Sequence, residues 1–403
     1  MRRYMMNKNR DITEILDVAP MGVYPPRGGG SLRIHNLNLF LSKKHNIFLF
    51  SQGLRRNEFN FPLRSWITHI NENYAEYRHV DFLTLISSSV LSKRGIPNIF
   101  FDEILKILKP SIIRKKITEC DVIKVEHPWQ FKHLYETKPR NKPIILDSHN
   151  VEIELITQTY HGFFSKKIAR IVNKKEYFAV THADAIFVTS REDKEKIHKI
   201  YNIPKSKIYE IPNGTDISKF DFRRESRTEK KVKKEKIILF VGANHPPNIE
   251  AVKEIIKMRE KIWEKNILFL VVGRCGEKFR YTHYKNINFT GYVKDVKKYF
   301  RLADIAINPM LSGSGTNIKM LEYFASGIPT ITTPMGARGI EIVNGKHAIV
   351  SDLENFPYHI TELLNNEDLR RKLGENARKL AEEKYDWKKI AERANRIIER
   401  IAE

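Results

Sequence analysis

Short apolar runs rich in β-branched residues alternate with helical patterns along the whole chain, and this alternation constrains the fold more than any single motif. It is typical of α/β architectures with parallel sheets. Helices fit between the runs, for example at Ser31–Ser42 and Ser165–His182. In the first half of the chain the predicted strands are Glu14–Pro20, Asn46–Phe50, Val80–Ile86, Asp121–Glu126, Pro143–Asp147, Ala185–Ser190 and Lys207–Ile211.

A change of composition divides the chain at Asp221–Lys236, which is dense in both charges and nearly free of large apolar residues. We interpret it as an exposed linker, with a nucleic-acid-binding arm as the alternative. Two doubly wound halves are therefore predicted, with ligands at the carboxyl ends of the strands and in the cleft between the halves. The second half is predicted to contain strands at Ile237–Val241, Ile267–Val272, Ile287–Gly291 and Ile305–Asn308 and helices at Asn248–Trp263, Lys294–Ala303, Asn366–Lys384 and Trp387–Ile401.

The charge balance is strongly basic, at +23 over 403 residues. Such a charge attracts polyanions, whether nucleic acid, anionic lipid or a phosphorylated substrate. No apolar run approaches the length of a membrane span, and the N-terminus lacks the apolar region of a signal peptide. Cys120 and Cys275 stand alone, which favours two free thiols in a reducing compartment over a zinc site or a disulfide.

The segment Asn308–Gly336 predicts a strand end, a glycine-rich turn, a helix and another strand. A helix that begins after glycines offers free backbone N–H groups to an anion, here those of Gly315, Thr316 and Asn317. Lys319 can add positive charge for a phosphate. Glu322, three residues further and on the same helical face, could accept hydrogen bonds from sugar hydroxyls. A nucleotide sugar would lie along such a helix with its phosphates at the N-terminus and its sugar hydroxyls near Glu322.

Two features of the first half have both a functional and a structural interpretation. Gly28–Gly30 follows the first strand and precedes a helix, so its backbone could approach a diphosphate or sugar closely; the alternative is an ordinary turn. His149 ends a predicted strand, where a parallel sheet presents residues to ligands, although a lone histidine is usually structural. Asp147 and Glu152 beside it could support His149 or serve as helix caps.

These motifs, in this order, resemble a family 4 glycosyltransferase of GT-B fold. The resemblance rests on Gly28–Gly30, Asp147–Glu152, Ile211–Asp216, Phe240–Gly242, Thr290–Val293 and above all the G-S-G-T loop and helix within Gly313–Gly336. It implies an acceptor-side Rossmann-like domain at 1–222, a linker at 223–236 and a donor-nucleotide-binding Rossmann-like domain at 237–386. It also implies that the last helix, 387–403, packs back on the first domain.

The resemblance further implies transfer of a sugar from a nucleotide-sugar donor to a glycan or lipid-linked acceptor hydroxyl, with retention of configuration and no obligatory metal or other cofactor. His149 maps onto the family's active-site histidine. The residues expected at the site are His149 and Lys319 as catalytic groups, and Gly29, Gly30, Gly242, Asn244, Arg274, Val293, Gly315, Thr316, Asn317 and Glu322 as donor-binding groups.

The chain departs from the family pattern in two places. The family often carries two glutamates eight positions apart, but Ser314 stands where the first would precede Glu322. The arginine and lysine common after the first strand of the second domain are missing from Gly242–Asn248. Lys319 or Arg274 could supply that charge.

Other functions remain as alternatives. The chain has no Asp-x-Asp, no G-x-x-x-x-G-K-[ST] and no G-x-G-x-x-G, which disfavours metal-dependent transfer of the other common fold, P-loop chemistry and NAD enzymes. A nucleic-acid- or polyanion-binding protein would explain the charge, but no binding module is recognisable, so no nucleic acid is expected. A GT-B enzyme of another reaction, such as a sugar epimerase, is the third alternative.

The segment Leu91–Ile117 is both basic and amphipathic, as surface-bound membrane helices are. The alternative is a pair of helices that pack on the sheet with their lysines in water. Lys166, Lys167, Arg170 and Lys174 fall on one face of the predicted helix Ser165–His182 and would extend a basic surface. We therefore expect a cytoplasmic protein that could bind peripherally to the inner face of an anionic membrane.

Overall fold

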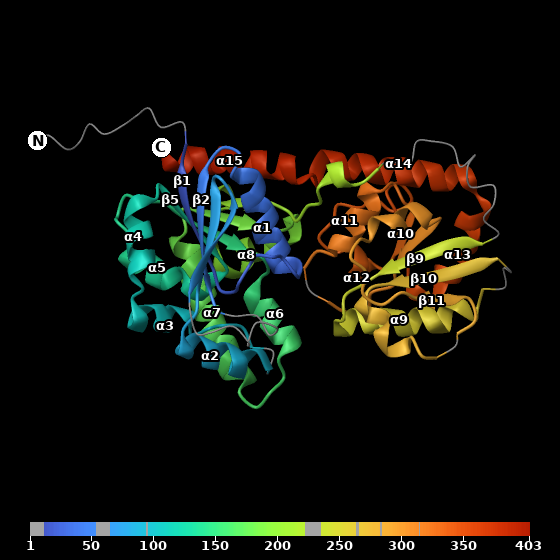
Figure 1. Ribbon diagram of the computed structural model, residues 1–403, viewed down its shortest axis with the longest axis horizontal. Coiled ribbons are helices and arrows are strands. Elements are labelled where there is room, and N and C mark those ends of the chain that lie inside the picture. Colours follow the sequence, from blue (N-terminus) through green and yellow to red (C-terminus); the bar gives the residue numbers. More distant parts are fainter. Residues whose placement is uncertain are drawn as a thin grey trace, which may run out of the picture. The chain divides into compact units, whose positions relative to one another are not determined.

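The structure is a computed structural model that describes residues 12–53, 65–93, 96–221, 235–262, 266–282, 284–313 and 315–403. The chain divides by its contacts into two compact units. Unit 1 comprises Met1–Pro212 and Ile390–Glu403, and unit 2 comprises Asn213–Lys389. Each is a mainly parallel sheet flanked by helices, the Rossmann-like arrangement that the sequence predicts (Figure 1). In the described part of the chain, no helix is long and apolar enough to cross a membrane.

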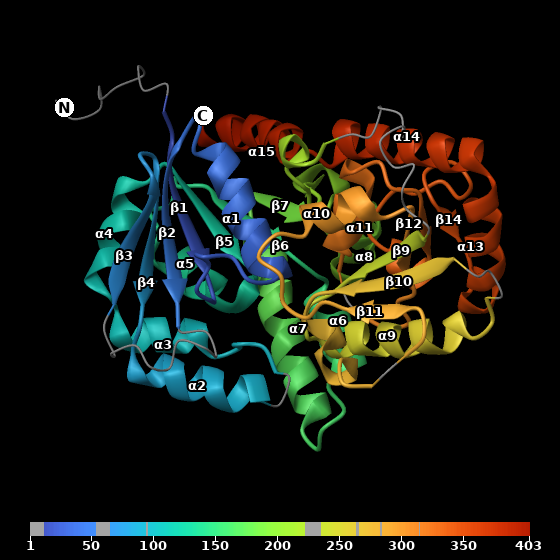
Figure 2. The ribbon, with the colours of Figure 1, turned by 45° about the vertical axis from the view of Figure 1, so that its right-hand side comes forward.

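The sheet of unit 1 has eight strands in the order β3-β4-β2-β1-β5-β6-β7-β8. Every neighbouring pair is parallel except β3 and β4 (Figure 2). The central strands are buried along their whole length, whereas β3 at the edge alternates between half-buried and exposed residues. The strands are β1 (Glu14–Ala19), β2 (Asn46–Gln52), β3 (Trp66–Asn71), β4 (Tyr74–His79), β5 (Val122–Glu126), β6 (Ile144–Ser148), β7 (Ala185–Val188) and β8 (Ile208–Glu210).

Helices connect these strands and bury their apolar faces on the sheet. One core cluster joins Leu16 and Val18 of β1 to Ile113, Leu134 and Ala179 on three different helices. The helices of unit 1 are α1 (Gly29–Leu41), α2 (Phe82–Lys93), α3 (Phe101–Leu108), α4 (Ser111–Glu119), α5 (Phe131–Thr137), α6 (Glu152–Thr159), α7 (Ser165–His182) and α8 (Arg191–Tyr201), with most of α15 (Trp387–Ala402).

The sheet of unit 2 has six strands in the order β11-β10-β9-β12-β13-β14. Alternate residues of β9 enter two different core clusters: Ile238 and Phe240 join one, and Ile237 and Leu239 join the other. Both faces of the sheet are therefore covered, as in doubly wound folds. The elements are β9 (Lys236–Val241), α9 (Pro246–Arg259), β10 (Ile267–Val272), β11 (Ile287–Phe289), α10 (Lys297–Leu302), β12 (Ile305–Asn308), α11 (Ile318–Ala325), β13 (Thr330–Thr332), α12 (Pro334–Ala337), β14 (Ile349–Val350), α13 (Phe356–Asn365) and α14 (Glu367–Lys384).

The strand predicted at Val80–Ile86 is wrong. The strand is β4, which ends at His79, and α2 begins at Phe82. Asp81 explains the difference, because its carboxylate accepts a hydrogen bond of 2.7 Å from the backbone N–H of Thr84. This is the capping interaction that starts a helix, and it outweighs the β-like appearance of the apolar run that follows.

The boundary between the units also differs from the sequence-based one. Asn213–Asp221 belong with unit 2, where Thr215 exchanges backbone hydrogen bonds with Tyr385 and Trp387 and Phe220 packs on Phe300. Of the expected linker at 223–236, residues 223–234 lie outside the described residues. In the closing helix α15, the residues from Ile390 onward belong with unit 1, where Asn395 hydrogen-bonds His45.

Strand order reverses once in each sheet, and each reversal lies beside the first strand of its unit. In unit 1 the chain moves outward from β1 to β2 and β4 and then returns to β5 on the other side of β1. In unit 2 it moves from β9 to β10 and β11 and returns to β12. Ligands of open parallel sheets bind outside the carboxyl ends of the strands at such switch points.

Candidate active site

His149 lies directly after β6, at the switch-point end of the unit 1 sheet. Its ring is buried, and its Nε2 is 2.5 Å from Oε2 of Glu126 at the end of β5. Burial, followed by the nearby charge of His127, holds the pKa of His149 well below its usual range. A neutral imidazole whose Nε2–H donates to Glu126 has an acceptor lone pair on Nδ1.

Gly30 lies against that second nitrogen. A Cβ built on Gly30 would be 3.6 Å from Nδ1 of His149. The glycines also begin α1. Gly29 is its first residue, and Gly28 is its N-cap and has no side chain that could cap the helix. The structure thus brings together two predicted features, the glycine turn and the histidine, and the glycine leaves the approach to Nδ1 open.

His127, which the sequence analysis did not select, lies against His149 with ring centroids 4.2 Å apart and the ring planes tilted by 45°. It follows β5 with a φ of 69°, in the left-handed region that non-glycine residues seldom adopt. Its Nδ1 is 2.7 Å from Oε1 of Glu152. Burial alone would lower the pKa of His127, but the hydrogen bond and charge of Glu152 outweigh it and raise the pKa.

Ion pairs surround the two histidines in the sheet interior. Arg33 of α1 is 2.7 Å from Asp147, and Lys124 contacts both Asp17 and Glu126. All five side chains are essentially inaccessible to water. Burial raises the pKa of Asp17 to about 7, whereas for Asp147 the effect of burial is outweighed by Arg33, and the pKa is lowered.

Within the described residues, Glu126, Asp147 and His149 form one group whose ligand atoms all lie within 4.8 Å of one another. A divalent cation there would compete with existing positive charges, because Lys124 already pairs with Glu126 and Arg33 with Asp147. The group therefore has side chains of the kinds that bind metals, but the negative charge of its carboxylates is already neutralised by Lys124 and Arg33.

In unit 2, glycines close the carboxyl ends of three adjacent strands: Gly242 after β9, Gly273 after β10 and Gly291 shortly after β11. Gly273 has a φ of 102°, and a Cβ on it would be 2.3 Å from the carbonyl oxygen of Gly242. Gly273 also bridges to Gly291. These contacts require bare backbone, and they form a surface that a ligand could approach closely.

Three further predicted residues lie on the loops of this edge. Asn244 is exposed after β9. Arg274 is exposed after β10, and its Nε is 3.1 Å from Oε1 of Glu277. Val293 is half-buried and packs on the apolar cluster that contains Met320 of α11. Arg274 is thus available at the surface, whereas Val293 has a packing role as well.

The N-terminus of α11 follows the turn that contains Gly313 and Gly315, with φ values of 137° and 69°. Asn317 is the N-cap, yet its side chain does not cap the helix; its Nδ2 donates instead to the carbonyl of Gly336. The Oγ1 of Thr316 is buried and has no hydrogen-bond partner among the described residues. The first N–H groups of α11 and this hydroxyl are therefore polar groups that a ligand could satisfy.

Lys319 is the second residue of α11 and lies in mostly apolar surroundings. Its Nζ is 2.6 Å from Oδ1 of Asn248 and 4.4 Å from the ring centroid of Phe240. In the described part of the chain it has no carboxylate within ion-pair distance. Burial lowers the pKa of Lys319 to about 8.

Glu322 lies on the same face of α11 and is half-buried. Its carboxylate has no hydrogen-bond partner among the described side chains, and burial raises its pKa to about 7. A carboxylate held in this state gains strongly from a ligand that donates hydrogen bonds to it.

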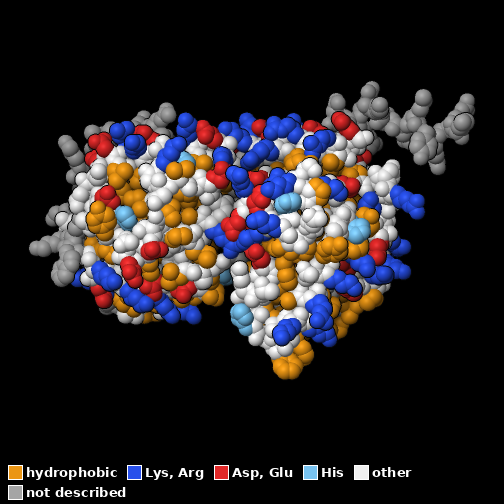
Figure 3. Space-filling view, turned by 180° about the vertical axis from the view of Figure 1, so that it is seen from behind, with side chains coloured by type: hydrophobic (Ala, Val, Ile, Leu, Met, Phe, Trp, Pro, Cys, Tyr) orange, Lys and Arg blue, Asp and Glu red, His pale blue; other side chains and the backbone are white. Residues whose placement is uncertain are grey.

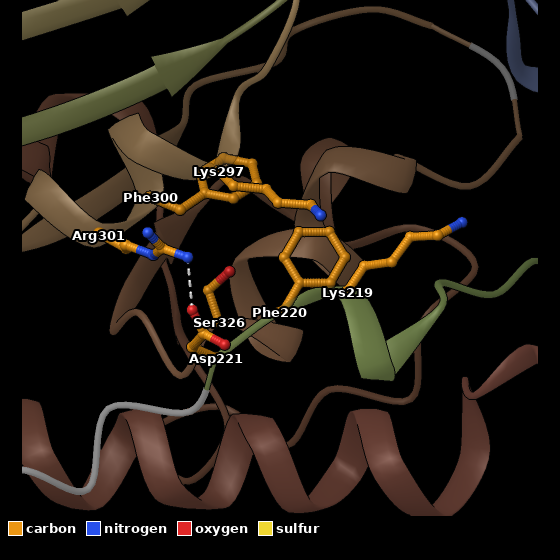
Figure 4. A pocket seen from close by; sticks show the side chains of 7 residues that line it. All are labelled: Lys219, Phe220, Asp221, Lys297, Phe300, Arg301 and Ser326. Carbon is orange, nitrogen blue, oxygen red and sulfur yellow. Dashed lines mark hydrogen bonds and ion pairs between the residues drawn. The ribbon is translucent and has the colours of Figure 1, made fainter.

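A separate small pocket of unit 2 lies elsewhere (Figure 4). Its lining includes Phe300, Arg301 and Ser326, near the C-terminal ends of α10 and α11. In a βαβ unit those helix ends neighbour the amino ends of the strands, opposite the switch point. Arg301 is 2.6 Å from Asp221 across it. It therefore does not belong to the candidate site.

The structure gathers the predicted residues in two groups, one per unit. His149, Gly29 and Gly30 lie at the switch point of unit 1, and the others lie at that of unit 2. Sequence analysis missed Glu126, His127, Lys124 and Arg33. The one available signal was Glu126-His127 at the end of a predicted strand, the same position that singled out His149.

Comparisons with known proteins support the family and the fold. Residues 27–219 match the model "Glycosyltransferase Family 4", and residues 235–366 match "Glycosyl transferases group 1". An uncharacterized glycosyltransferase of Methanocaldococcus jannaschii is 24% identical over 91% of this chain and 94% of its own length. Sucrose-phosphate synthase of Thermosynechococcus elongatus has a similar structure, with a TM-score of 0.73, 14% identity, and coverage of 96% of this chain and 99% of that one. Anabaena HepE in complex with UDP-glucose has a TM-score of 0.63 at 11% identity, covering 96% of this chain and all of that chain.

Proposed function

Because the chain belongs to the glycosyltransferases of GT-B fold, with a family 4 domain followed by a group 1 domain, we propose that it is a retaining enzyme that uses a nucleotide-sugar donor. The acceptor is a hydroxyl of a glycan or of a lipid-linked saccharide. Cys120 and Cys275 are buried free thiols, which supports a reducing, cytoplasmic site of action.

One observation carries the proposal: the start of α11 presents unsatisfied polar groups in the order that a nucleotide sugar needs. The N–H groups at Gly315, Thr316 and Asn317 face the diphosphate, with Lys319 one turn further on. Glu322 follows with a carboxylate that has no partner of its own among the described residues. Anions favour helix N-termini, and sugar hydroxyls donate to carboxylates. HepE, of the same fold, binds UDP-glucose, which supports a donor of this class.

In the proposed mechanism, the bond from the anomeric carbon to the diphosphate breaks through an oxocarbenium-like transition state. The diphosphate gathers negative charge as it leaves, and Lys319 together with the α11 N–H groups stabilises that charge. The acceptor hydroxyl attacks on the face that the diphosphate leaves, and a departing phosphate oxygen takes its proton. The nitrogen of His149 beside Gly30 accepts a hydrogen bond from a sugar hydroxyl, and the neutral imidazole shields the positive charge that builds on the anomeric carbon.

The reaction is proposed to need no metal ion or other cofactor. Lys319 supplies the positive charge for the diphosphate, and Lys124 and Arg33 already neutralise the carboxylates that could bind a cation in unit 1. We expect turnover to be unchanged, within a factor of two, after dialysis against a chelator. A loss of turnover that added Mg²⁺ or Mn²⁺ restored would contradict this part of the proposal.

The donor can be identified by thermal denaturation in the presence of UDP-, GDP- and ADP-sugars, since a ligand that binds only the folded state raises its melting temperature. One nucleotide class is expected to raise it, and Glu322→Gln is expected to abolish most of that shift. Lys294→Gln, a change at an exposed lysine of the same unit, is the control. No shift with any of the three classes would overturn the assignment of the donor.

A further inference from the structure

Helix α2 exposes one apolar face, whereas its opposite side, with Thr84 and Leu91, is buried. Phe82, Leu83, Ile86 and Val90 are 65%, 41%, 46% and 44% exposed, and their spacing places them on one helical face. Thr84 is fully buried and hydrogen-bonds Gln52 and Asp81. We refer to these four exposed residues as the α2 face. Large exposed apolar patches mark sites of interaction.

A second exposed apolar feature lies at the turn between α6 and α7. Phe163 is 96% exposed and Phe164 is 57% exposed, and their rings pack edge to face on each other. Figures 1 and 2 both show this turn and α2 at the same end of unit 1. A shared apolar cluster explains their closeness, because Leu91 of α2 and Val172 of α7 both belong to it.

The surroundings of the aromatic turn are positively charged. Between Leu155 and Lys175 the sequence contains no acidic residue. Lys166, Lys167, Arg170 and Lys174 are exposed on α7, and none makes an ion pair with a described residue. The nearby acidic groups Asp102 and Glu103 are already paired with Lys175. In Figure 3 hydrophobic and basic side chains lie next to each other at this end of unit 1.

We propose that the α2 face and the aromatic turn form a docking surface for an anionic lipid bilayer. Exposed aromatic and aliphatic side chains enter the boundary between headgroups and acyl chains, and the lysines of α7 bind the anionic headgroups. A protein partner would need its own acidic and apolar groups in register, whereas a bilayer supplies both over any area. Lysines and arginines without ion pairs among the described residues, next to exposed phenylalanines, therefore fit a lipid surface best.

This location differs from the segment expected from the sequence. Within Leu91–Ile117, most of the apolar side chains serve the core: Ile99, Ile104, Leu105 and Ile113 are buried. That segment is therefore mainly packed in the core, although Phe100, Ile107 and Leu108 are 43%, 69% and 37% exposed. The α2 face and the aromatic turn lie before and after it in the chain. The docking proposal does not depend on the proposed reaction, since the α2 face and the turn contain none of the candidate site residues.

Co-sedimentation with vesicles tests the proposal. Binding to vesicles of phosphatidylcholine alone is compared with binding to vesicles in which 30% of the lipid, by experimental design, is phosphatidylglycerol. The full-length protein is expected to bind the anionic vesicles and to be released by 0.5 M salt. The double variants F163S/F164S and I86S/V90S are each expected to bind about tenfold more weakly, because a bilayer buries these side chains. The variant K166E/K167E is expected to lose the preference for anionic vesicles.

Tyr281→Ser is the matched control, since Tyr281 is 94% exposed but lies on unit 2. Each variant is checked for an unchanged melting temperature and an unchanged thermal shift with nucleotide sugar, so a failure of folding or of donor binding is recognised separately. Vesicle binding that the variants retain, or its absence in the unsubstituted protein, would overturn the proposal. So would dimers in sedimentation velocity that the same variants abolish without any vesicle binding, because the surface would then bind a second copy.

Discussion

At the scale of single residues, two adjacent histidines differ in charge because of their partners. His127 pairs with Glu152, which raises its pKa, while His149 lies between that imidazole and Glu126 and is kept neutral. Such divergence of neighbouring pKa values often marks functional sites. Because the ring of His127 lies against that of His149, its expected role is to set the orientation and charge of His149.

Replacing His127 with Asn should raise the pKa of His149, because it removes the positive charge that helps to hold that pKa down. Turnover requires neutral His149 in the proposed mechanism, so the acidic limb of the kcat profile should move to higher pH. Because the ψ of 163° at this position lies outside the αL region that asparagine favours, the folding of the variant is checked by its melting temperature. Measurement of kcat against pH between 5 and 9 checks the prediction.

His133→Asn is the control, because His133 is a buried histidine of α5 with no contact to His149. Its pH profile should match that of the unsubstituted enzyme. An unchanged acidic limb in the His127 variant, together with normal folding, would show that His127 does not act through His149.

The pKa values of the α11 pair predict how donor binding depends on pH. Burial raises the pKa of Glu322 to about 7, so the ionised form that accepts hydroxyls becomes abundant only as pH rises through that value. Burial lowers the pKa of Lys319 to about 8, so its positive charge is lost as pH rises further. Affinity for the nucleoside diphosphate should therefore be greatest between about pH 7 and 8, as calorimetry can measure.

Two variants separate the limbs of this curve. Glu322→Gln should weaken binding roughly tenfold, as loss of a hydrogen bond to a charged group does, and should remove the acidic limb. Lys319→Arg keeps its charge at all these pH values and should remove the alkaline limb. A profile that stays bell-shaped in both variants would assign the titration to other groups.

The sequence predicts some of these residues well and cannot predict others. Gly30 and His149 follow the ends of separate strands, and the rule for parallel sheets brings such positions together. Glu126 and His127 occupy an equivalent position, but their importance lies in a contact between two rings and in buried ion pairs. Those contacts depend on side-chain directions that residue spacing does not specify.

At the scale of secondary structure elements, the close approach of α14 to the end of α11 depends on a helical glycine. A Cβ built on Gly374 of α14 would be 2.3 Å from the carbonyl oxygen of Gly327, in the turn after α11. Glycine in a helix normally costs stability relative to alanine. Its presence here is explained by the backbone of Gly327, which leaves no room for a side chain.

Gly374→Ala should therefore destabilise the protein by about 1–3 kcal/mol, although alanine is the better helix former, because the helix must shift away from the turn. Chemical denaturation followed by circular dichroism measures the change. Lys372→Ala, an exposed position on the same helix, should change stability by less than about 0.5 kcal/mol. A stabilising effect of Gly374→Ala would show that the two elements can separate without cost.

Helices and strands with a clear pattern of apolar residues were predicted almost to the residue. Those that depend on a capping side chain or on a neighbouring strand were not. Helix α7 and strands β10 and β12 have the predicted bounds. The run Val80–Ile86 contains enough β-branched and aromatic side chains to suggest a strand, yet Asp81 begins a helix there. The antiparallel edge pair β3 and β4 was also missed, because its alternating residues are mostly polar.

At the scale of the whole molecule, both units place their polar groups at the same topological position, the switch point beside the first strand. The alternation of strands and helices predicts this for two doubly wound sheets. The boundary between the units was harder to predict, since Asn213–Asp221 join unit 2 through backbone bonds with residues more than 150 positions later. Sequence composition contains no information about such pairing between residues that are distant in the sequence.

The central claim is retaining transfer from a nucleotide sugar, and product analysis by proton NMR tests it most directly. The enzyme is incubated with the nucleotide sugar that stabilises it and with free and lipid-linked saccharide acceptors. We predict one nucleoside diphosphate released for each glycoside formed, with the anomeric configuration of the donor preserved. An inverted glycoside, free sugar without glycoside, or an isomerised nucleotide sugar would contradict the account.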